Sequence, residues 1–303
     1  MFTDISIVIV TYNSAAVIGP CLTSLFATQG DLALEIIIVD NGSTDDTLTL
    51  LQRDFPTVTL LTGHGNVGFA RGNNLGFQAS HGRYLFMLNP DTEVYPGALH
   101  TLLAYADTHP TVGMLAPHMV YPDGTLQHNT FHFPDLAQAF YGFFERLVPL
   151  DSPKNGRYLP EDYTRERPVE HILGAAVFIR RELYEQLGGM DPAYPLYFEE
   201  TDWCFRAHRA GWQLRYIPTA TVMHIGAHST TRDPERSSVL FARSRARFYR
   251  KSYGLPGYLA LKVITLLGLT YWQARTLAGL FRRRITWPTF TRRQWSYWHI
   301  LWA

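Results

Sequence analysis

The segment 85–91 constrains the fold of this chain more than any other. It reads Leu-Phe-Met-Leu-Asn-Pro-Asp, so a run of apolar residues is followed at once by polar ones. A short apolar run of this kind predicts a strand that is buried on both faces of a parallel sheet. Pro90 ends the strand because proline cannot donate to a sheet ladder. Asp91 is therefore expected at the carboxyl end of a central strand, the edge where open α/β sheets bind ligands.

Strands and helical stretches alternate on both sides of this segment. We expect strands over residues 5–10, 35–39 and 58–61, and helices near 15–27, 45–53 and 69–80, with Ser43 or Thr44 capping the second helix. Later we expect a strand over 172–179, a helix that carries 199–206 and stops at Gly211, and a strand over 213–217 that leads to 222–224. This alternation predicts an α/β fold with a mostly parallel sheet. Residues 121–170 lose the rhythm and are rich in Pro, Tyr and His, so we interpret them as a substrate-shaping insertion.

Charge divides the chain into two parts. The net charge is only +1, but residues 1–231 hold 13 Lys+Arg against 24 Asp+Glu, whereas residues 232–303 hold 14 against 2. An acidic body and a basic tail are expected to meet different partners. Two cysteines, Cys21 and Cys204, fit neither a disulfide framework nor a zinc motif and predict a reducing compartment. The first residues lack the basic stretch of a signal peptide, so we expect the body in the cytoplasm.

One glycine motif points to a different class of enzyme. Residues 63–68 match G-x-G-x-x-G between a predicted strand and a predicted helix, the fingerprint of dinucleotide-binding dehydrogenases. That fingerprint belongs on the first βα unit, and here two such units precede it, which disfavours a dehydrogenase. The helix start could still face a phosphate, because backbone N–H groups and the helix dipole favour anions there. A plain tight turn is the alternative.

The strongest signal is a set of motifs in a fixed order. The motifs lie at residues 10–13, 39–45, 66–74, 89–91, 188–191 and 197–203, with His224 after them. Their order closely resembles the family-2 glycosyltransferases of the GT-A fold, in the branch that includes bacterial rhamnosyltransferases, over roughly residues 4–230. The resemblance implies a GT-A domain over 1–231, a Rossmann-like sheet flanked by helices, with a nucleotide-binding half at about 1–120 and an acceptor half at about 121–231. Residues 232–303 would then form a helical, basic and amphipathic extension.

The same resemblance implies a binding site for the nucleotide of the donor. Carboxylates accept hydrogen bonds, so Asp40 would receive the ring N–H of uracil or thymine. Other residues would line the nucleotide pocket or approach the ribose and diphosphate: Thr11, Tyr12, Asn13, Asn66, Gly68 and Arg71. The alternatives are a turn or helix-cap role for Asp40 and an ordinary exposed helix position for Arg71.

A divalent ion, Mg²⁺ or Mn²⁺, would hold the donor diphosphate. The resemblance implies that Asp91 and His224 coordinate this ion, with His228 as the weaker alternative to His224. The family often has Asp-x-Asp where this chain has Asn-Pro-Asp, so Asn89 is a neutral ligand at best. A strand-end cap is the alternative for Asp91, and a structural role is the alternative for His224.

Inverting transfer also needs a base that deprotonates the acceptor hydroxyl. Glu199, Glu200 and Asp202 fall within one helical turn, and like charges so close raise one another's proton affinity. The position of the family's base corresponds to Glu200, while Glu199 or Asp202 could take the role. An acidic first turn that complements the helix dipole, without any chemistry, is the alternative.

The resemblance predicts the activity. We expect transfer of rhamnose from dTDP-rhamnose to a saccharide or polyprenyl-linked saccharide in cell-surface polysaccharide synthesis. Other UDP- or dTDP-sugars, with galactofuranose, N-acetylglucosamine or glucose, stay open. A nucleotidyltransferase would want a basic Gly-rich first loop, and this one is Thr-Tyr-Asn-Ser. A non-catalytic nucleotide-sugar-binding scaffold is the remaining rival.

The tail is expected to associate with a membrane or to form a homodimer. Residues 236–251 show a basic amphipathic pattern, and residues 255–281 are apolar apart from Lys262 and Arg275. These two charges leave too short an apolar run to span a bilayer, so we expect the tail to lie in the membrane interface. Arginines at 282–284 and tryptophans at 287, 295, 298 and 302 favour the headgroup level of an anionic leaflet. No RNA or DNA motif accompanies the tail, which disfavours nucleic acid, and we expect an enzyme that is peripheral on the inner face of the cell membrane.

Overall fold

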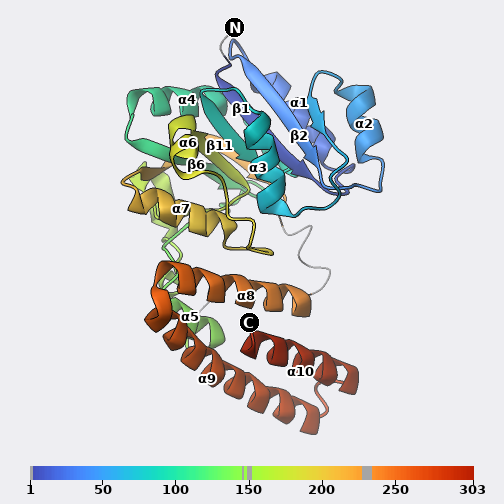
Figure 1. The fold of residues 1–303 in the computed structure, drawn as a ribbon, viewed down its shortest axis with the longest axis vertical. Helices are drawn as coiled ribbons and strands as arrows, with labels where there is room; N and C mark the ends of the chain where they lie inside the picture. Colours follow the sequence, from blue (N-terminus) through green and yellow to red (C-terminus); the bar gives the residue numbers. More distant parts are fainter. Residues whose placement is uncertain (1–2, 145–146, 149–151, 227–233) are drawn as a thin grey trace. The chain divides into compact units, whose positions relative to one another are not determined.

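The chain divides into two compact units. A computed structural model describes residues 3–144, 147–148, 152–226 and 234–303 (Figure 1). The first unit, here called the sheet unit, comprises Met1–His132, Tyr158–Pro192 and Glu199–Gly226. The second, the helical unit, comprises Phe133–Arg157, Ala193–Phe198 and Ala227–Ala303. Two segments outside the basic tail, 133–157 and 193–198, thus join it in the helical unit.

A nine-stranded sheet forms the centre of the sheet unit. Its order is β3 (Thr59–Leu61), β2 (Leu34–Asp40), β1 (Ile5–Thr11), β4 (Tyr84–Leu88), β10 (Ala176–Arg180), β6 (Val112–Val120), β11 (Gln213–His224) and β5 (Thr92–Val94), with β8 (Arg167–Pro168) also on β11. The first four strands run parallel, and β6 and β11 also run parallel to each other. Strand β10 lies antiparallel between β4 and β6. The predicted α/β fold with a mostly parallel sheet is confirmed.

Strand β1 lies where the strand order reverses. The chain runs outward from β1 through β2 to β3 on one side and returns to β4 on the other. Thr11 pairs with Asp40 at the carboxyl ends of β1 and β2, and the parallel pairing of β1 with β4 brings the end of β4 to the same edge. Ligand sites in open α/β sheets lie at such a switch point, outside the carboxyl ends of the strands.

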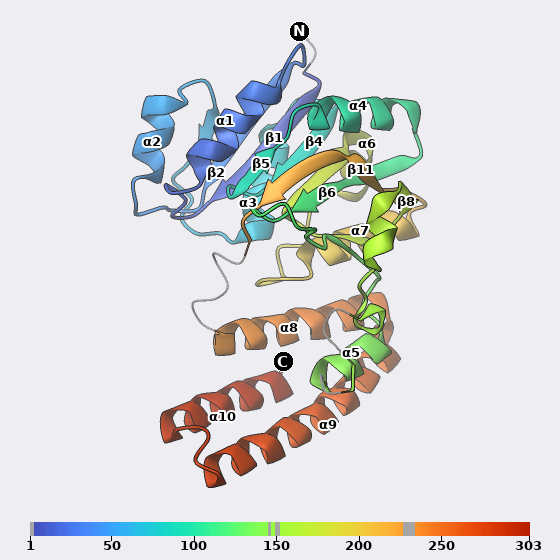
Figure 2. The same cartoon turned by 180° about the vertical axis from the view of Figure 1, so that it is seen from behind.

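Helices cover both faces of the sheet (Figures 1 and 2). The helices of this unit are α1 (Ile18–Thr28), α2 (Thr47–Asp54), α3 (Phe69–Ala79), α4 (Ala98–Thr108), α6 (Arg181–Leu187) and α7 (Glu199–Arg209). Alternate residues of β1 (Ile5, Ile7 and Ile9) share one buried cluster with apolar residues of α1 and α4. On the other face α3, α6 and α7 meet, since the Phe77 ring lies 5.6 Å from that of Tyr184 and 5.5 Å from that of Trp203.

Helix α3 lies unusually close to the sheet because glycines face it. A Cβ atom at Gly76 would lie 2.2 Å from Val8 Cγ1, closer than any real contact. A side chain there would push the helix outward, together with the loop that precedes it. The glycine therefore lets the second half of α3 pack directly against β1.

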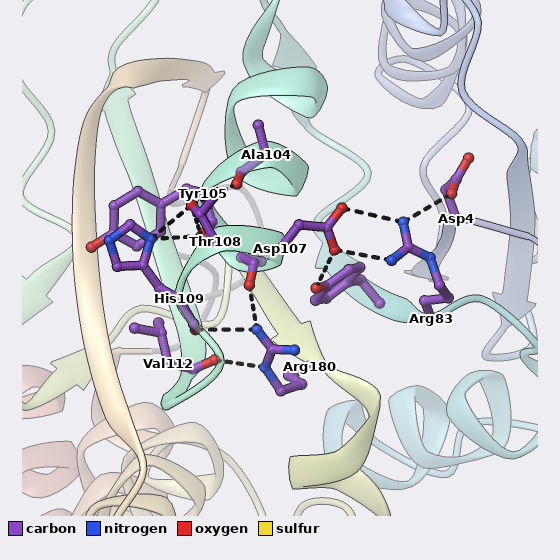
Figure 3. A network of polar contacts seen from close by, with 11 residues as sticks. Asp4, Arg83, Ala104, Tyr105, Asp107, Thr108, His109, Val112 and Arg180 are labelled. Carbon is purple, nitrogen blue, oxygen red and sulfur yellow. Dashed lines mark hydrogen bonds and ion pairs between the residues drawn. The ribbon is translucent and has the colours of Figure 1, made fainter.

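The opposite edge of the sheet is held by an ion-pair network (Figure 3). The Arg83 guanidinium bridges Asp107 on α4, at 2.9 Å, and Asp4 just before β1, at 3.2 Å. The Tyr84 hydroxyl also donates to Asp107, at 2.7 Å. From β10, Arg180 donates to the Val112 carbonyl at 2.9 Å. These contacts secure the amino-terminal ends of β1, β4 and β6 and the carboxyl end of the antiparallel β10, away from the edge where the polar motifs gather.

The helical unit has a core of its own. It contains α5 (Leu136–Phe143), a 3₁₀ turn (Pro153–Asn155), α8 (Pro234–Ser252), α9 (Gly254–Phe281) and α10 (Trp287–Leu301). The core gathers apolar residues from these four α-helices: Phe143, Val239, Ala242, Leu269 and Ile300. Helix α9 is the one helix in the described part of the chain that is long and apolar enough to cross a membrane.

Some elements differ from the sequence-based expectation. Helix α2 begins at Thr47 with Asp46 at the cap position, and the expected cap residue Ser43 instead accepts a hydrogen bond from Asn13 N at 2.9 Å. The expected strand over 172–179 is two strands, β9 (His171–Ile172) and β10, with a turn at residues 174–175 between them. Leu173 N bonds to Asn129 O at 2.8 Å, beside β9. Strand β9 pairs with β7 (Thr130–Phe131) in a separate two-stranded sheet. Strand β11 runs unbroken to His224, with an irregularity between Ile217 and Thr221.

Candidate active site

The loops that follow β1 and β2 are tied together by one side chain. Asn13 Oδ1 accepts hydrogen bonds from Thr44 N at 2.8 Å and from Asp45 N at 3.3 Å. Asn13 itself has a φ of 52°, a left-handed conformation that asparagine adopts more readily than most residues. Among the predicted nucleotide-site residues, Asn13 thus shapes the pocket loop, while its neighbour Tyr12 is exposed.

Asp40 is buried and its carboxylate is partly engaged. Its Oδ2 accepts from the backbone N–H groups of Gly42 and Ser43, both at 3.0 Å, which closes the turn after β2. Its Oδ1 accepts from the Thr11 hydroxyl at 3.2 Å. A carboxylate oxygen has two lone pairs, so Oδ1 keeps one acceptor site. Asp40 therefore acts in the turn and retains the capacity to receive one more N–H.

The glycine-rich loop comes against the same edge. Asn41 Nδ2 donates to Gly68 O at 3.2 Å, and Asn66 Oδ1 accepts from Gly68 N at 3.1 Å. Gly68 has a φ of 83° at the position before α3, a conformation that favours glycine. The N-terminus of α3 thus opens beside the end of β2, and Arg71 is exposed on its first turn. A helix N-terminus in this place offers free N–H groups to an anion.

Asp91 and His224 meet at the carboxyl end of β4. His224 Nε2 lies 3.3 Å from Asp91 Oδ1, and Asn89 Nδ2 lies 3.4 Å from the same nitrogen. The pairing of His224 with Thr92 between β11 and β5 sets this contact. Burial alone would raise the pKa of Asp91, but hydrogen bonds from His224 and from Gly226 N outweigh it and hold the pKa below its usual range. The carboxylate is therefore ionised at neutral pH.

Gln127 determines how His224 presents its ring. Its Oε1 lies 3.0 Å from His224 Nδ1, and both side chains are buried. A carbonyl oxygen only accepts, so Nδ1 carries the hydrogen and Nε2 is the nitrogen that meets the Asp91 carboxylate. Nε2 can donate a proton to Asp91, as in the hydrogen bond described above, or offer its lone pair to a cation held between the two side chains. Two acceptors that face each other need a proton or a cation between them. Histidines that bind metals commonly donate their other N–H in this way.

The protein alone offers a divalent ion few ligands. Within the described part of the chain, no group of three or more His, Cys, Asp or Glu side chains is placed to hold a metal. Mg²⁺ and Mn²⁺ take about six ligands and are often held by one or two carboxylates together with substrate phosphates. Asp91 and His224 fit an ion of that kind, for which a diphosphate would complete the coordination. Asn89 turns its Nδ2 toward His224, and an amide nitrogen donates, so Asn89 would offer Oδ1 to an ion only after its amide rotates.

Two glutamates open helix α7 in contrasting environments. Glu199 is 4% exposed and its Oε2 is buried without a hydrogen-bond partner. Burial, followed by the charge of Glu200, raises the pKa of Glu199 to about 8. Glu200 is only partly buried, and its Oε1 lies 3.8 Å from His171 Nε2, which in turn lies 3.0 Å from Thr201 Oγ1. Because its pKa is raised to about 8, Glu199 keeps its proton at neutral pH.

Asp202 has a different set of partners from the two glutamates. It is 1% exposed and accepts from Arg206 Nε at 2.9 Å, one helical turn on. Arg206 also donates to the carbonyls of Leu187, at 2.9 Å, and Gly189, at 2.7 Å. Asn74 on α3 bonds to both backbone groups of Met190 in the same loop. Asp202 thus orients an arginine that holds the 188–190 loop.

Short backbone links connect these groups within the sheet unit. Asn89 N donates to Ala175 O at 2.8 Å, just before β10. At the preceding position, a Cβ on Gly174 would lie 3.3 Å from the Phe69 ring and 3.6 Å from Glu200 Cγ. The segment 174–175 therefore touches the end of β4, the start of α3 and the start of α7. His228 lies outside the described residues.

Three residues of this site were missed by sequence reasoning. Gln127 and His171 lie in or beside the irregular 121–170 segment, where no periodic pattern signals which side chains point inward. Asn74 stands within the 66–74 motif, but nothing in the sequence indicates its bonds to Met190, which is far away along the chain. All three act on a predicted residue or its loop through tertiary contacts.

Comparison with known proteins identifies the family of this chain. The family model for glycosyl transferase family 2 matches residues 6–188. An N-acetylglucosaminyl-diphospho-decaprenol L-rhamnosyltransferase of Mycobacterium tuberculosis is 32% identical over 286 residues, which is 86% of this chain and 92% of the relative. A family match over more than half of the chain and a relative of this similarity establish the family.

Solved structures establish the fold. The mannosyltransferase PcManGT of Pyrobaculum calidifontis, solved with GDP-Man and Mn²⁺, superposes with a TM-score of 0.56 at 16% identity, over 99% of this chain and 86% of that one. GalNAc-T7, solved with UDP, GalNAc and Mn²⁺, gives a TM-score of 0.59 at 16% identity over 84% of this chain, which spans about half (51%) of that protein. The chain therefore belongs to the family-2 glycosyltransferases of the GT-A fold, in the branch that contains rhamnosyltransferases.

Proposed function

We propose that this enzyme transfers rhamnose from dTDP-rhamnose, with inversion at the anomeric carbon, to a lipid-linked saccharide. The observation that carries the proposal is the Asp91–His224 pair at the carboxyl edge of the sheet, next to Asn89. The choice of rhamnose and of a diphospho-lipid acceptor follows the name of the Mycobacterium tuberculosis relative. Transfer of galactofuranose, N-acetylglucosamine or glucose from a UDP- or dTDP-donor is the alternative.

The donor nucleotide would lie across the ends of β1 and β2. Asp40 Oδ1, which has one acceptor site left, would receive the ring N–H of thymine or uracil. Tyr12 is exposed there and could stack on the base, while Thr11 and Asn13 hold the pocket loops. Asn66, Gly68 and Arg71 would face the ribose and the diphosphate from the N-terminus of α3.

Asp91 and His224 would hold the ion that the diphosphate brings, with Asn89 as a neutral neighbour. When bound, Mg²⁺ or Mn²⁺ would neutralise the charge that develops on the departing diphosphate. Gln127 would keep the His224 ring in the orientation and tautomer that this requires.

Glu200 would remove the proton from the acceptor hydroxyl. A base must be ionised, and Glu199, with its pKa raised to about 8, is protonated at pH 7. Asp202 is buried, and its Oδ2 accepts a hydrogen bond from Arg206. Glu200 is the most accessible of the three acids, and the neighbouring His171 would orient it. The deprotonated hydroxyl would then attack the anomeric carbon from the face opposite the leaving group.

The proposed acceptor indicates where in the cell the enzyme would work. A polyprenyl-linked saccharide resides in a membrane, so we propose that the enzyme works in the cytoplasm, peripherally on the inner face of the cell membrane, in cell-surface polysaccharide synthesis. The basic tail would provide the contact with the membrane surface. A homodimer through the same tail is the competing arrangement.

A donor screen tests the proposal directly. Thermal unfolding would be followed with dTDP-rhamnose and with the UDP- and dTDP-sugars named above, each with and without Mn²⁺. We expect the largest stabilisation from dTDP-rhamnose with Mn²⁺, and sugar transfer from it to a GlcNAc-diphospho-lipid. Stronger stabilisation by a different nucleotide sugar would identify that sugar as the donor in place of dTDP-rhamnose. A response to NAD(P) alone would overturn the proposal.

A further inference from the structure

Helix α9 has two faces of different character. Its buried residues, which pack into the helical unit, are Leu261, Thr265, Gly268, Leu269 and Thr276. A second set consists of large apolar residues that are exposed: Leu255, Leu259, Val263, Leu266, Leu267, Leu277 and Phe281. Val263 is 59% exposed and Phe281 is 84% exposed, so no other part of the unit covers them. We call the second set the apolar stripe.

The apolar stripe occupies one side of the helix. At 3.6 residues per turn its members fall within about 120° of the circumference, opposite the buried residues. Lys262 and Arg275 fall outside it, one on each flank. With a rise of about 1.5 Å per residue, the apolar stripe is roughly 39 Å long. The apolar residues form two patches, 255–267 and 277–281, because Thr270 and Gln273 occupy the same side of the helix between them. The first patch is larger than the scattered exposed leucines that soluble proteins tolerate.

The buried face of α9 is committed to its own unit. A Cβ atom at Gly268 would lie 2.1 Å from the Phe143 ring of α5, and Trp272 Nε1 donates to Phe143 O at 2.9 Å. Lys262 Nζ donates to the Leu301 carbonyl at 2.7 Å, beside the end of α10. A helix that spans a bilayer would have to leave these contacts, or else carry the whole unit and its charged residues into the hydrocarbon.

Positive charge and tryptophan adjoin the apolar stripe. Arg282, Arg283 and Arg284 follow its last residue and are exposed. Helix α10 adds more exposed residues of the same kinds: Trp287, Arg292, Arg293, Trp295 and Trp298. Neither α9 nor α10 contains an Asp or a Glu. Arginines favour anionic phosphate headgroups, and tryptophans favour the interface between headgroup and acyl chain.

We propose that the apolar stripe of α9 lies in the plane of an anionic lipid bilayer, with the arginines of residues 282–284, 292 and 293 at its phosphates. The helix then acts as an interfacial anchor and does not span the membrane. The charge complementarity argues for lipid over a second copy of the chain, because two copies would bring two sets of arginines together. The inference rests on the proposed function only in treating a membrane as the place where the acceptor lies.

Vesicle flotation of the full chain tests the proposal. The probe is phosphatidylcholine vesicles with and without phosphatidylglycerol. We expect the wild-type protein to float with the anionic vesicles and to lose binding in high salt. Leu266→Asp and Phe281→Asp should each lower partition at least about tenfold, because each removes a large apolar side chain from the lipid. Leu159→Asp, at an exposed leucine of the sheet unit, is the matched control and should float as the wild type does.

Other outcomes would overturn the proposal. If both α9 variants float as the wild type does, the apolar stripe does not bind the membrane. Retention in the membrane after alkaline carbonate extraction would mean a spanning helix. A dimer in light scattering that Leu266→Asp converts to a monomer, without any vesicle binding, would assign the apolar stripe to self-association.

The same preparations separate this proposal from the proposed function. Leu266→Asp should still be stabilised by dTDP-rhamnose with Mn²⁺, since the donor site lies in the sheet unit. Asp91→Ala should lose that stabilisation and still float. If the donor assay fails, the flotation assay still tests membrane binding. If the flotation assay fails, the donor assay still tests the proposed function.

Discussion

His224 Nε2 lies 3.3 Å from Asp91 Oδ1, although the two residues are 133 positions apart. His224 ends β11, whereas Asp91 lies between β4 and β5. The contact depends on backbone register: His224 pairs with Thr92, Ile225 N donates to Asp91 O at 3.0 Å, and Gly226 N donates to Asp91 Oδ2 at 3.2 Å. The end of β11 and the two residues after it thus contact Asp91, the residue that directly precedes β5. A carboxylate and an imidazole brought together in this way are poised for an ion that a substrate shares.

Replacement of Asp91 should weaken donor binding and transfer while the protein still folds. Asp91→Ala removes the anionic ligand, so we expect transfer to fall by roughly two to three orders of magnitude. The affinity for dTDP in the presence of Mn²⁺, measured by calorimetry, should also fall. Asp31→Ala, at an exposed aspartate, is the control and should leave both unchanged. Normal Mn²⁺-dependent donor binding by Asp91→Ala would contradict the metal assignment.

Gln127 should affect the affinity for Mn²⁺ only by orienting the His224 ring. Gln127→Leu removes the acceptor of the Nδ1–H, so the ring loses its orientation, and we expect Mn²⁺ affinity to fall about 10- to 100-fold. Gln127→Glu keeps an acceptor there and should retain most of the affinity. Paramagnetic resonance of Mn²⁺ titrated in the presence of dTDP measures this without an activity assay. Equal affinities for the two variants would exclude the positioning role.

The sequence predicts where the strand ends lie better than it predicts which ends meet. The apolar run before Asp91 and the motif order were enough to place Asp40, Asp91 and His224 at or just after the carboxyl ends of strands, because burial on both faces leaves a clear local pattern. The contact between Asp91 and His224 arises from antiparallel pairing of β5 with β11. A strand of three residues carries too little pattern to reveal its partner.

The acids of α7 show the same limit. Glu199, Glu200 and Asp202 are equivalent members of an acidic first turn when the sequence is read alone. Their environments differ because Glu199 is buried without a partner at Oε2, Glu200 neighbours His171, and Asp202 is paired with Arg206. Those distinctions come from packing against segments far away in the sequence, which helical periodicity does not encode.

Glu200→Gln should stop the chemistry and spare the donor. The amide cannot accept the acceptor's proton, so we expect turnover to fall by about 10²- to 10⁴-fold. Binding of dTDP-rhamnose with Mn²⁺ should remain near the wild-type value, because Glu200 has no place in the nucleotide site. Calorimetry and a transfer assay on one preparation give both numbers. Near-normal turnover would place the base elsewhere.

Asp202→Asn should act on stability. The substitution leaves the Arg206 charge without its buried partner, and we expect a loss of about 3 kcal/mol in the free energy of unfolding. The loop at 188–190, which Arg206 also holds, should become more susceptible to proteolysis. Urea denaturation measures the first effect, with Glu200→Gln as the comparison on the same helix. A fully stable but inactive Asp202→Asn would instead make Asp202 the base.

The buried Glu199 should make stability fall as pH rises. Its pKa is about 8 in the folded chain, against 4.5 for an ordinary glutamate. Between these two values the folded state holds a proton that the unfolded state has released, so each rise in pH favours unfolding. The effect is absent below about pH 4.5, grows through the interval and is constant above about pH 8.

Glu199→Gln removes this titration while keeping a neutral side chain of the same size. We therefore expect the melting temperature of the variant to fall less than that of the wild type between about pH 5 and pH 8. Glu185→Gln, at an exposed glutamate of α6, should follow the wild-type curve and serves as the control. Parallel curves for Glu199→Gln and the wild type would mean that Glu199 is already ionised in the folded chain. In that case Glu199 would be available as a base, and the assignment of that role to Glu200 would lose its electrostatic support.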